Sequence, residues 1–284
     1  MRRLFSPVRS GVLGPVKRSF LVSPFFVKRK TRFTHIYHCT VYRTGSQWLR
    51  RIFSDWRVAR YSGLRYEFYY QRICGPDDFW SNDARFPFSS PFQPRRIVTI
   101  YASHDQYERI PKVEPYTTFF VLRDPRDIVV SYYFFSRSCR DNGPRGPLYH
   151  RLESPVEGLS ATIEVLEKIG VFAALRSWME LPMRDDPHVR LIRFEDLIGA
   201  NQLGVFQSLF ASCDLILPDK VLTELLAAHT FKKLTGGRRQ GEEDVMAHHR
   251  KGIIGDWKNY FLDDHIAQFK AVTGDLINIT GYTW

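Results

Sequence analysis

The chain has 284 residues, of which 44% are hydrophobic and 15% aromatic. This composition is typical of a folded globular protein with a substantial core and excludes a disordered chain. Nine of the eleven net positive charges lie in residues 1–32, which contain no acid. The remaining body is therefore close to neutral, and no general nucleic-acid-binding surface is expected.

The first part of the chain is predicted to be a basic extension, residues 1–33, beside a single domain of residues 34–284. Two interpretations of the extension stay open: an organelle transit peptide, or a flexible basic arm that contacts acidic lipid weakly or contacts nothing. Without a transit peptide the protein is expected to be cytoplasmic. No run in the sequence approaches the ~20 apolar residues of a membrane-spanning helix. The four cysteines are scattered, which is typical of reduced, buried residues.

The segment from residue 36 to residue 53 reads as a strand, a tight loop and a helix. Residues 36–42 are β-branched and aromatic, and residues 43–47 are polar with one glycine. Unpaired N–H groups at such a helix start, with the helix dipole, form an anion site that most often binds phosphate. Arg43 and the hydroxyls of Thr44 and Ser46 would add charge and hydrogen bonds. An ordinary strand-turn-helix with a surface arginine is the alternative.

Two further predicted strands end beside this loop. Residues 97–101 are followed by His104, and residues 117–122 lead into Arg123. Ligands of open α/β sheets bind outside the carboxyl ends of the parallel strands, where both residues would lie. A helix with Asp124 as cap and Pro125 in its first turn is expected to reach residue 136 and to carry Ser131. A purely local hydrogen-bonding role is the alternative for each of these side chains.

The rest of the chain continues the alternation of strands and helices. Residues 55–93 and 141–158 read as loops, the first with a short helix. A strand is predicted at 189–194, and helices at 159–181, 219–228 and 263–277, the first interrupted at Gly170. This order predicts an α/β fold with a parallel sheet. His248 and His249 have no carboxylate or cysteine partners at ligand spacing, so no metal site is predicted.

Three separated motifs resemble those of the sulfotransferases that use 3′-phosphoadenosine 5′-phosphosulfate (PAPS). They are Tyr42–Trp48, Arg123–Asp127 with Ser131–Tyr133, and Arg250–Gly252 with Gly255–Lys258. The resemblance covers roughly residues 36–262. It implies a three-layer α/β sandwich with a central parallel sheet, of the P-loop nucleotide-binding type. It also implies metal-independent sulfonate transfer to a hydroxyl of a small molecule, lipid or sugar, with 3′,5′-adenosine bisphosphate (PAP) as product.

The same resemblance implies a role for each matching residue. The loop Arg43, Thr44, Gly45, Ser46 and Gln47 would hold the 5′-phosphosulfate, and Trp48 would lie against the adenine. The 3′-phosphate would be bound by Arg123, Ser131, Arg250, Lys251 and Gly252, and Phe231 would stack on the adenine. His104 would act as general base, and Arg43 would stabilise the leaving phosphate.

The sequence also departs from the family pattern. Arg43 and Ala102 stand where the family usually has lysines, and Phe194 where an aromatic hydroxyl is common. Residues 259–262 do not match the dimer motif of many cytosolic members. Two other hypotheses stay open: a nucleotide kinase, whose Lys-Ser/Thr pair and magnesium carboxylate the loop lacks, and a basic adaptor acting through the first 32 residues.

Overall fold

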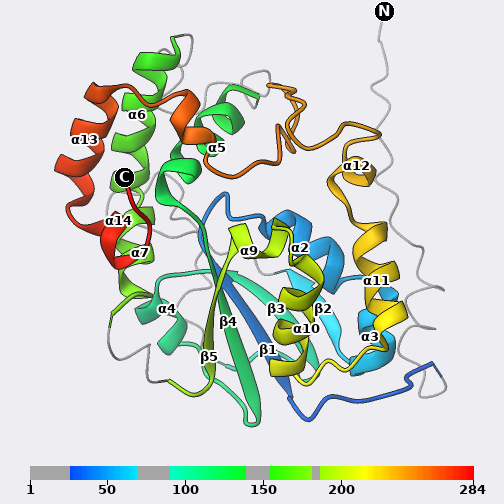
Figure 1. Cartoon of the computed structure of the whole chain (residues 1–284). Coiled ribbons are helices and arrows are strands. Elements are labelled where there is room, and N and C mark those ends of the chain that lie inside the picture. Colours follow the sequence, from blue (N-terminus) through cyan, green and yellow to red (C-terminus); the bar gives the residue numbers. More distant parts are fainter. Residues whose placement is uncertain (1–25, 69–89, 139–153, 181–185) are drawn as a thin grey trace, which may run out of the picture.

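The computed structural model describes residues 26–68, 90–138, 154–180 and 186–284. Its centre is a five-stranded sheet in the order β2-β3-β1-β4-β5, and every neighbouring pair is parallel (Figure 1). The strands are β1 (His35–Thr40), β2 (Arg65–Phe68), β3 (Arg96–Tyr101), β4 (Tyr116–Leu122) and β5 (Val189–Arg193). The predicted α/β fold with a central parallel sheet is thus confirmed.

Strand β1 lies in the middle of the sheet, between β3 and β4. Thr40, its last residue, pairs with Tyr101 of β3 on one side and with Val121 of β4 on the other. The carboxyl ends of the three strands therefore meet at one edge. The chain leaves β1 toward the β2–β3 side and later returns to the β4 side, so the connections diverge at β1. Such a switch point is where open α/β sheets form a ligand crevice.

Helices cover both faces of the sheet. One face carries α2 (Ser46–Phe53), α3 (Trp56–Ser62), α9 (Phe194–Ile198), α10 (Gln202–Ser212) and α11 (Asp219–Ala228). The other carries α4 (His104–Glu108), α5 (Pro125–Ser138), α6 (Pro155–Lys168), α7 (Val171–Ser177), α13 (Asp263–Thr273) and α14 (Leu276–Ile279). The short α12 (Phe231–Leu234) and the 3₁₀ turn η3 (Asp256–Asn259) lie in the segment that returns across the top of the sheet (Figure 1).

The strands alternate their side chains between two separate cores. Ile36 and Phe119 belong to the core under α2 and α10, whereas Tyr37 and Phe120 belong to the core under α5 and α6. All four side chains are fully buried. Both faces of the sheet are therefore apolar, as a parallel sheet between two helix layers requires. This arrangement is the predicted three-layer sandwich.

Most predicted elements are present, with shifted ends. The predicted helix at 219–228 coincides with α11, and the predicted helix at 128–136 lies inside α5, which begins at Pro125. Strand β2 falls in the stretch that was interpreted as a loop with a short helix. The predicted final helix breaks at Gly274, a residue with φ of 59° that separates α13 from α14. Residues 69–89 and 139–153, the larger parts of the two predicted loops, lie outside the described residues.

The end of the predicted basic extension packs on the domain. The backbone N–H groups of Lys28 and Thr31 donate to the carbonyls of Arg60 and Ser62 in α3, at 2.8 and 2.9 Å. Phe33 is buried in the core on the same side of the sheet. Residues 1–25 of the predicted extension lie outside the described residues.

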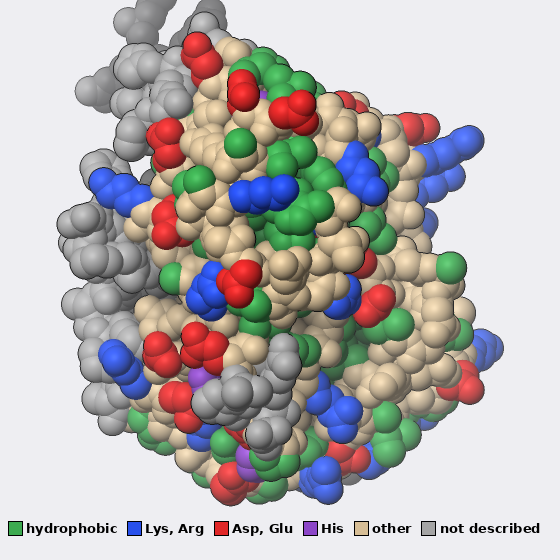
Figure 2. Space-filling view, turned by 60° about the vertical axis from the view of Figure 1, so that its left-hand side comes forward, with side chains coloured by type: hydrophobic (Ala, Val, Ile, Leu, Met, Phe, Trp, Pro, Cys, Tyr) green, Lys and Arg blue, Asp and Glu red, His purple; other side chains and the backbone are tan. Residues whose placement is uncertain are grey.

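The surface carries both signs of charge. Figure 2 shows acidic and basic side chains scattered over the side that faces the viewer, with hydrophobic side chains between them. This distribution agrees with the near-neutral charge predicted for the body. Within the described ranges, none of the helices has the length and apolar character needed to cross a membrane.

Candidate functional site

The loop that connects β1 to α2 is held by its own hydroxyl groups. The hydroxyl of Thr44 bonds to that of Thr40 and also donates to the carbonyl of Val41 at 3.1 Å. The hydroxyl of Ser46 bonds to that of Tyr101, at the end of β3. Thr44 and Ser46 are both buried. These two side chains, predicted to bind phosphate, therefore also fix the shape of the loop, whose backbone N–H groups start helix α2.

Gly45 allows this loop to pass close to another part of the chain. Its φ of 80° lies in the left-handed region, and it caps the N-terminus of α2. A Cβ atom at this position would lie 2.4 Å from the ring of Phe194. Gln47 follows in the first turn of α2 and is half-buried.

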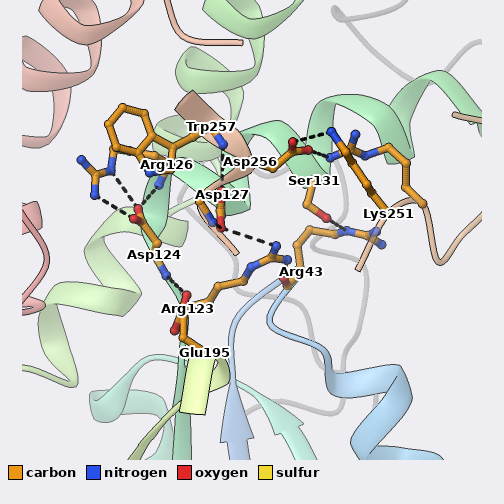
Figure 3. Close-up of polar contacts among 12 residues, drawn as sticks. Arg43, Arg123, Asp124, Arg126, Asp127, Ser131, Glu195, Lys251, Asp256 and Trp257 are labelled. Atoms are coloured by element: carbon orange, nitrogen blue, oxygen red, sulfur yellow. Dashed lines mark hydrogen bonds and ion pairs between the residues drawn. The ribbon is translucent and has the colours of Figure 1, made fainter. Parts of the chain in front are cut away.

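Arg43 leaves the loop and connects three elements. Its Nε donates to the hydroxyl of Ser131 in α5 at 3.0 Å (Figure 3). Its Nη2 lies 3.4 Å from the carbonyl oxygen of His248. The guanidinium lies over the ring of Phe135, 4.7 Å from its centre. Ser131 and Phe135 are one helical turn apart, so Arg43 lies along one face of α5.

Arg123, at the end of β4, reaches the same loop from below. Its Nη1 donates to the carbonyl of Arg43 at 2.8 Å, and its guanidinium lies 4.7 Å from the ring centre of Phe194. The side chain is 12% exposed, and its Nε has no hydrogen-bond partner within the described ranges. Arg43, Ser131 and Arg123, three of the predicted ligand-binding residues, are thus brought together, and Nε of Arg123 is a buried donor without a partner in the described ranges.

The helix start after Arg123 contains a buried ion pair. Asp124 accepts two hydrogen bonds from the Arg126 guanidinium, at 2.9 and 2.7 Å, and one from the Arg126 backbone N–H. Arg126 is 2% exposed, and its guanidinium lies over the ring of Trp257, 3.8 Å from the ring centre. Glu195 accepts a hydrogen bond from the Asp124 backbone N–H. The Asp124–Arg126 pair therefore stabilises the first turn of α5.

The next residue, Asp127, joins this helix start to η3. Its Oδ2 accepts the N–H of Gly255 at 2.8 Å, and its Oδ1 accepts the N–H of Trp257 at 2.9 Å. The same Oδ2 lies 3.8 Å from Nη2 of Arg123. Burial raises the pKa of Asp127, and the charge of Arg123 with the two N–H groups opposes that effect. The motif Arg123–Asp127 includes Asp127, but the sequence alone predicts none of these contacts.

The segment 238–252, called the C-terminal strap below, folds back on itself above α5. Arg238 donates to the carbonyls of His249 and Arg250, at 2.8 and 2.6 Å. Arg250 forms ion pairs with Glu243 and Asp256 and lies over Phe134, and Lys251 bonds to Asp256 at 2.8 Å. These two acidic partners were not predicted, and they hold both cations in place.

Gly252 closes the strap against the predicted adenine platform. A Cβ atom at residue 252 would lie 2.6 Å from ring atoms of Phe231, the first residue of α12. On the other side, Trp48 donates from Nε1 to the carbonyl of His229 at 2.8 Å. The ring of His229 bonds to Asp55 at 3.0 Å. Trp48 and Phe231 are therefore anchored to the same corner between α11 and α12.

His104 begins α4 just beyond the end of β3, at the edge where the loop lies. Its backbone N–H donates to the hydroxyl of Ser177 at 2.9 Å, and its ring packs edge-on against Trp178. Its Nε2 lies 3.7 Å from a carboxylate oxygen of Glu108. Within the described ranges, the hydrogen bonds and ring contacts of His104 connect it to α4 and the α7 region and not to Arg43 or Arg123. Ala102 is buried and offers its carbonyl to Trp178.

Metal-ligating side chains do not cluster in this region. Among the residues that the structure describes, no group of three or more His, Cys, Asp and Glu side chains is arranged to hold a metal ion. His248 and His249 instead face arginines. Burial, with Arg43 and Arg51, lowers the pKa of both histidines to about 4.

The fold and the site together define a parallel α/β protein with a strand-loop-helix segment and converging arginines at its switch point. A family model for the sulfotransferase domain matches residues 33–281, and the chain belongs to this family. The flavonol 3-sulfotransferase of Flaveria bidentis is 24% identical over 211 residues, which cover 66% of this chain and 64% of that protein. The sulfotransferase 1 family member D1 of Mus musculus is 24% identical over 56% of this chain and 52% of its own length. The chain thus spans between half and two thirds of these relatives.

Solved structures share the fold over most of the chain. A mouse sulfotransferase complexed with PAP has a TM-score of 0.57 and 17% identity, and the match covers 90% of this chain and 89% of that one. A retinol dehydratase in complex with retinol and PAP has a TM-score of 0.58 and 16% identity, with 91% and 85% covered. At these identities the likeness shows the fold.

Proposed function

We propose that the protein transfers the sulfonate group of PAPS to an acceptor hydroxyl. The observation that carries this proposal is the convergence of three distant segments. The loop after β1, the residues after β4 and the C-terminal strap meet through Arg43, Arg123 and Asp127 (Figure 3). Family membership and the PAP complexes of the structural relatives give this convergence its chemical interpretation.

The residues present fit a doubly phosphorylated nucleotide. Arg123 has a buried Nε donor without a partner in the described ranges. An unpaired buried donor is costly, and a bound anion would supply the missing hydrogen bond. Gly45 and Gly252 let the backbone approach Phe194 and Phe231 where any side chain would collide. Arg123, Ser131 and the strap would hold the 3′-phosphate, and the loop with Arg43 would hold the 5′ end. Trp48 and Phe231 would lie beside the base.

The reaction then needs one proton acceptor and stabilisation of one anion. The acceptor oxygen forms a bond to sulfur while the bond from sulfur to the 5′-phosphate oxygen breaks. The hydroxyl proton passes to the imidazole of His104, and the electron pair of the broken bond leaves on PAP. Loop N–H groups and Arg43 stabilise the charge on the leaving phosphate. Positioning and fixed charges supply the catalysis in this scheme.

We further propose a small, ring-bearing acceptor. The rings of Tyr42 and Tyr132 lie 6.2 Å apart, those of Tyr132 and Phe135 lie 6.3 Å apart, and Arg43 packs on Phe135. Partly exposed aromatic side chains beside the expected sulfonate site favour a flat apolar acceptor. The relatives point the same way, since they include a flavonol 3-sulfotransferase and retinol dehydratase complexes with retinol and with androsterone.

Calorimetric titration with PAP tests the nucleotide assignment directly. The wild-type chain should bind PAP without magnesium, and ATP with magnesium should not compete. Replacing Arg123 by Ala should weaken binding by about 10- to 100-fold, because charge-assisted contacts to the 3′-phosphate are lost. The control is Arg109→Ala, an exposed arginine at the end of α4. Equal PAP affinity in both variants would contradict the proposal.

Labelled PAPS tests the transfer step and the acceptor together. Incubation with phenols, sterols, retinoids, lipids and sugars should label a ring-bearing alcohol or phenol in preference to a sugar. Labelling of sugars alone would reject the proposed acceptor class while leaving the nucleotide assignment intact.

A further inference from the structure

One carboxylate lies between the two groups of cations that are expected to bind the same phosphate. Oδ2 of Asp127 accepts the N–H of Gly255 and lies 3.8 Å from Arg123, and Oδ1 accepts the N–H of Trp257. The Asp127 side chain is completely buried. Water therefore cannot replace these partners, and each is costly to leave unpaired.

The contacts continue from Asp127 into the C-terminal strap. Asp256 lies between Gly255 and Trp257, the two residues whose N–H groups Asp127 binds. Asp256 in turn holds Arg250 by an ion pair and Lys251 at 2.8 Å. Hydrogen bonds, ion pairs and the backbone of η3 thus connect Arg123, just after β4, through Asp127 to the strap cations (Figure 3).

The position of Asp127 on its helix makes this connection specific. Asp127, Ser131 and Phe135 follow each other at intervals of four residues, so they share one face of α5. Asp127 meets Arg123 on that face, while Ser131 and Phe135 meet Arg43. An acidic residue in the first turn of a helix is also stabilised by the helix dipole, which favours its charged form.

We propose that Asp127 is a positioning residue that couples the grip of Arg123 on the nucleotide 3′-phosphate to the placement of the C-terminal strap. The inference rests on the proposed function and deepens it. Loss of the Asp127 charge would release Arg123 and η3 together, so recognition of the 3′-phosphate would suffer. The 5′ end would still be held by the loop after β1, which Asp127 does not contact.

The test compares PAP with adenosine 5′-monophosphate (AMP), which lacks only the 3′-phosphate. Asp127→Asn should lower the affinity for PAP by about tenfold or more while changing the affinity for AMP by less than about threefold. A general loss of folding would weaken the binding of both nucleotides alike. The ratio of the two affinities therefore separates a positioning role of Asp127 from a loss of folding. An unchanged ratio in the variant overturns the inference.

Asp214 supplies a matched control. Its carboxylate also holds one arginine and one backbone N–H, those of Arg29 at 2.5 Å and Arg32 at 2.7 Å. It lies beyond α10, and these partners belong to the N-terminal segment rather than to the site. Asp214→Asn should leave the ratio of PAP to AMP affinity unchanged. The same change of ratio in both variants also overturns the inference.

A measurement on the unaltered protein covers the case in which Asp127→Asn does not fold. PAP should slow hydrogen exchange in the peptide that contains Gly255 and Trp257, and AMP should not. Equal effects of the two nucleotides, or no effect of PAP once it is bound, would reject the coupling. A wild-type chain that binds neither nucleotide would instead overturn the proposed function itself.

Discussion

The ring of Phe194 occupies the space in which residue 45 would otherwise carry a side chain. A Cβ at Gly45 would lie 2.4 Å from this ring, and the same ring supports the guanidinium of Arg123 at 4.7 Å. One aromatic side chain at the start of α9 therefore sets both the path of the loop after β1 and the position of the arginine after β4.

Replacing Gly45 by Ala should accordingly lower the unfolding free energy by more than the left-handed backbone conformation alone would explain. The left-handed φ costs about 1 kcal/mol of unfolding free energy for a non-glycine residue, and the collision with Phe194 adds about 1–3 kcal/mol. Urea unfolding measures the sum of these two losses of unfolding free energy, and PAP titration shows whether the altered loop still binds the nucleotide. Gly236→Ala is the control, since Gly236 has a similar φ of 72° and open space around it. Equal losses in the two variants would show that the contact with Phe194 is unimportant.

Arg43→Lys tests the departure from the family's usual lysine. Lysine keeps the charge but lacks the planar guanidinium that here bonds to Ser131, approaches the His248 carbonyl and packs on Phe135. PAP affinity is expected to fall by about tenfold, and Arg43→Ala should lower it further. Titration calorimetry gives the order of the three proteins. Wild-type affinity in Arg43→Lys would mean that charge alone matters at this position.

His104→Gln should separate the proton transfer from nucleotide binding. The turnover rate with labelled PAPS is expected to fall by about 10²–10⁴-fold, which is the usual contribution of a general base to the rate. The affinity for PAP should stay unchanged. His188→Gln is a matched control because the His188 ring also faces a carboxylate, that of Glu114 at 3.8 Å, before the start of β5. Full turnover in His104→Gln would remove His104 from the reaction.

The paired histidines of the strap predict a dependence of stability on pH. Burial with nearby arginines lowers the pKa of His248 and His249 from 6.5 to about 4 in the folded chain. Between these values the unfolded chain binds more protons, so the contribution of the two histidines to stability falls as the pH is lowered from 6.5 toward 4. Urea unfolding without nucleotide at pH 7 and pH 4.5 should show this loss in the wild type.

The double variant H248N and H249N isolates this effect. Its loss of unfolding free energy between pH 7 and pH 4.5 should be smaller than that of the wild type. Other buried acids, such as Asp127 and Glu195 with raised pKa values, titrate in both proteins and cancel in the comparison. An equal loss in both proteins would contradict the prediction.

The features that could be predicted from the sequence are those that neighbouring residues determine. Buried strands of β-branched residues, the Pro125 helix start and the polar loop with Gly45 all follow from local pattern. Strand β2 was missed because it is a four-residue edge strand, Arg65–Phe68, with charged and aromatic residues alternating inside an irregular aromatic stretch. Its pairing with β3 is what makes it a strand.

The acidic partners of the site could not be predicted because their roles depend on pairs far apart in the chain. Asp127 binds residues that lie 128 and 130 positions later. Thr44 and Ser46 were expected to face phosphate, and only the fold places their hydroxyls against Thr40 and Tyr101. Asp256 follows Arg250 closely in the sequence, yet a turn at Gly252 and Gly255 is needed to bring the two side chains together.

The contact between Gly252 and Phe231 has a consequence for any attempt to change nucleotide preference. Since the strap rests directly on the aromatic ring, a bulkier residue at position 252 would displace both the ring that is proposed to receive the base and the backbone that is proposed to bind the 3′-phosphate. Selectivity for the base and for the phosphate would therefore shift in concert, so a substitution at residue 252 could not change one preference without the other.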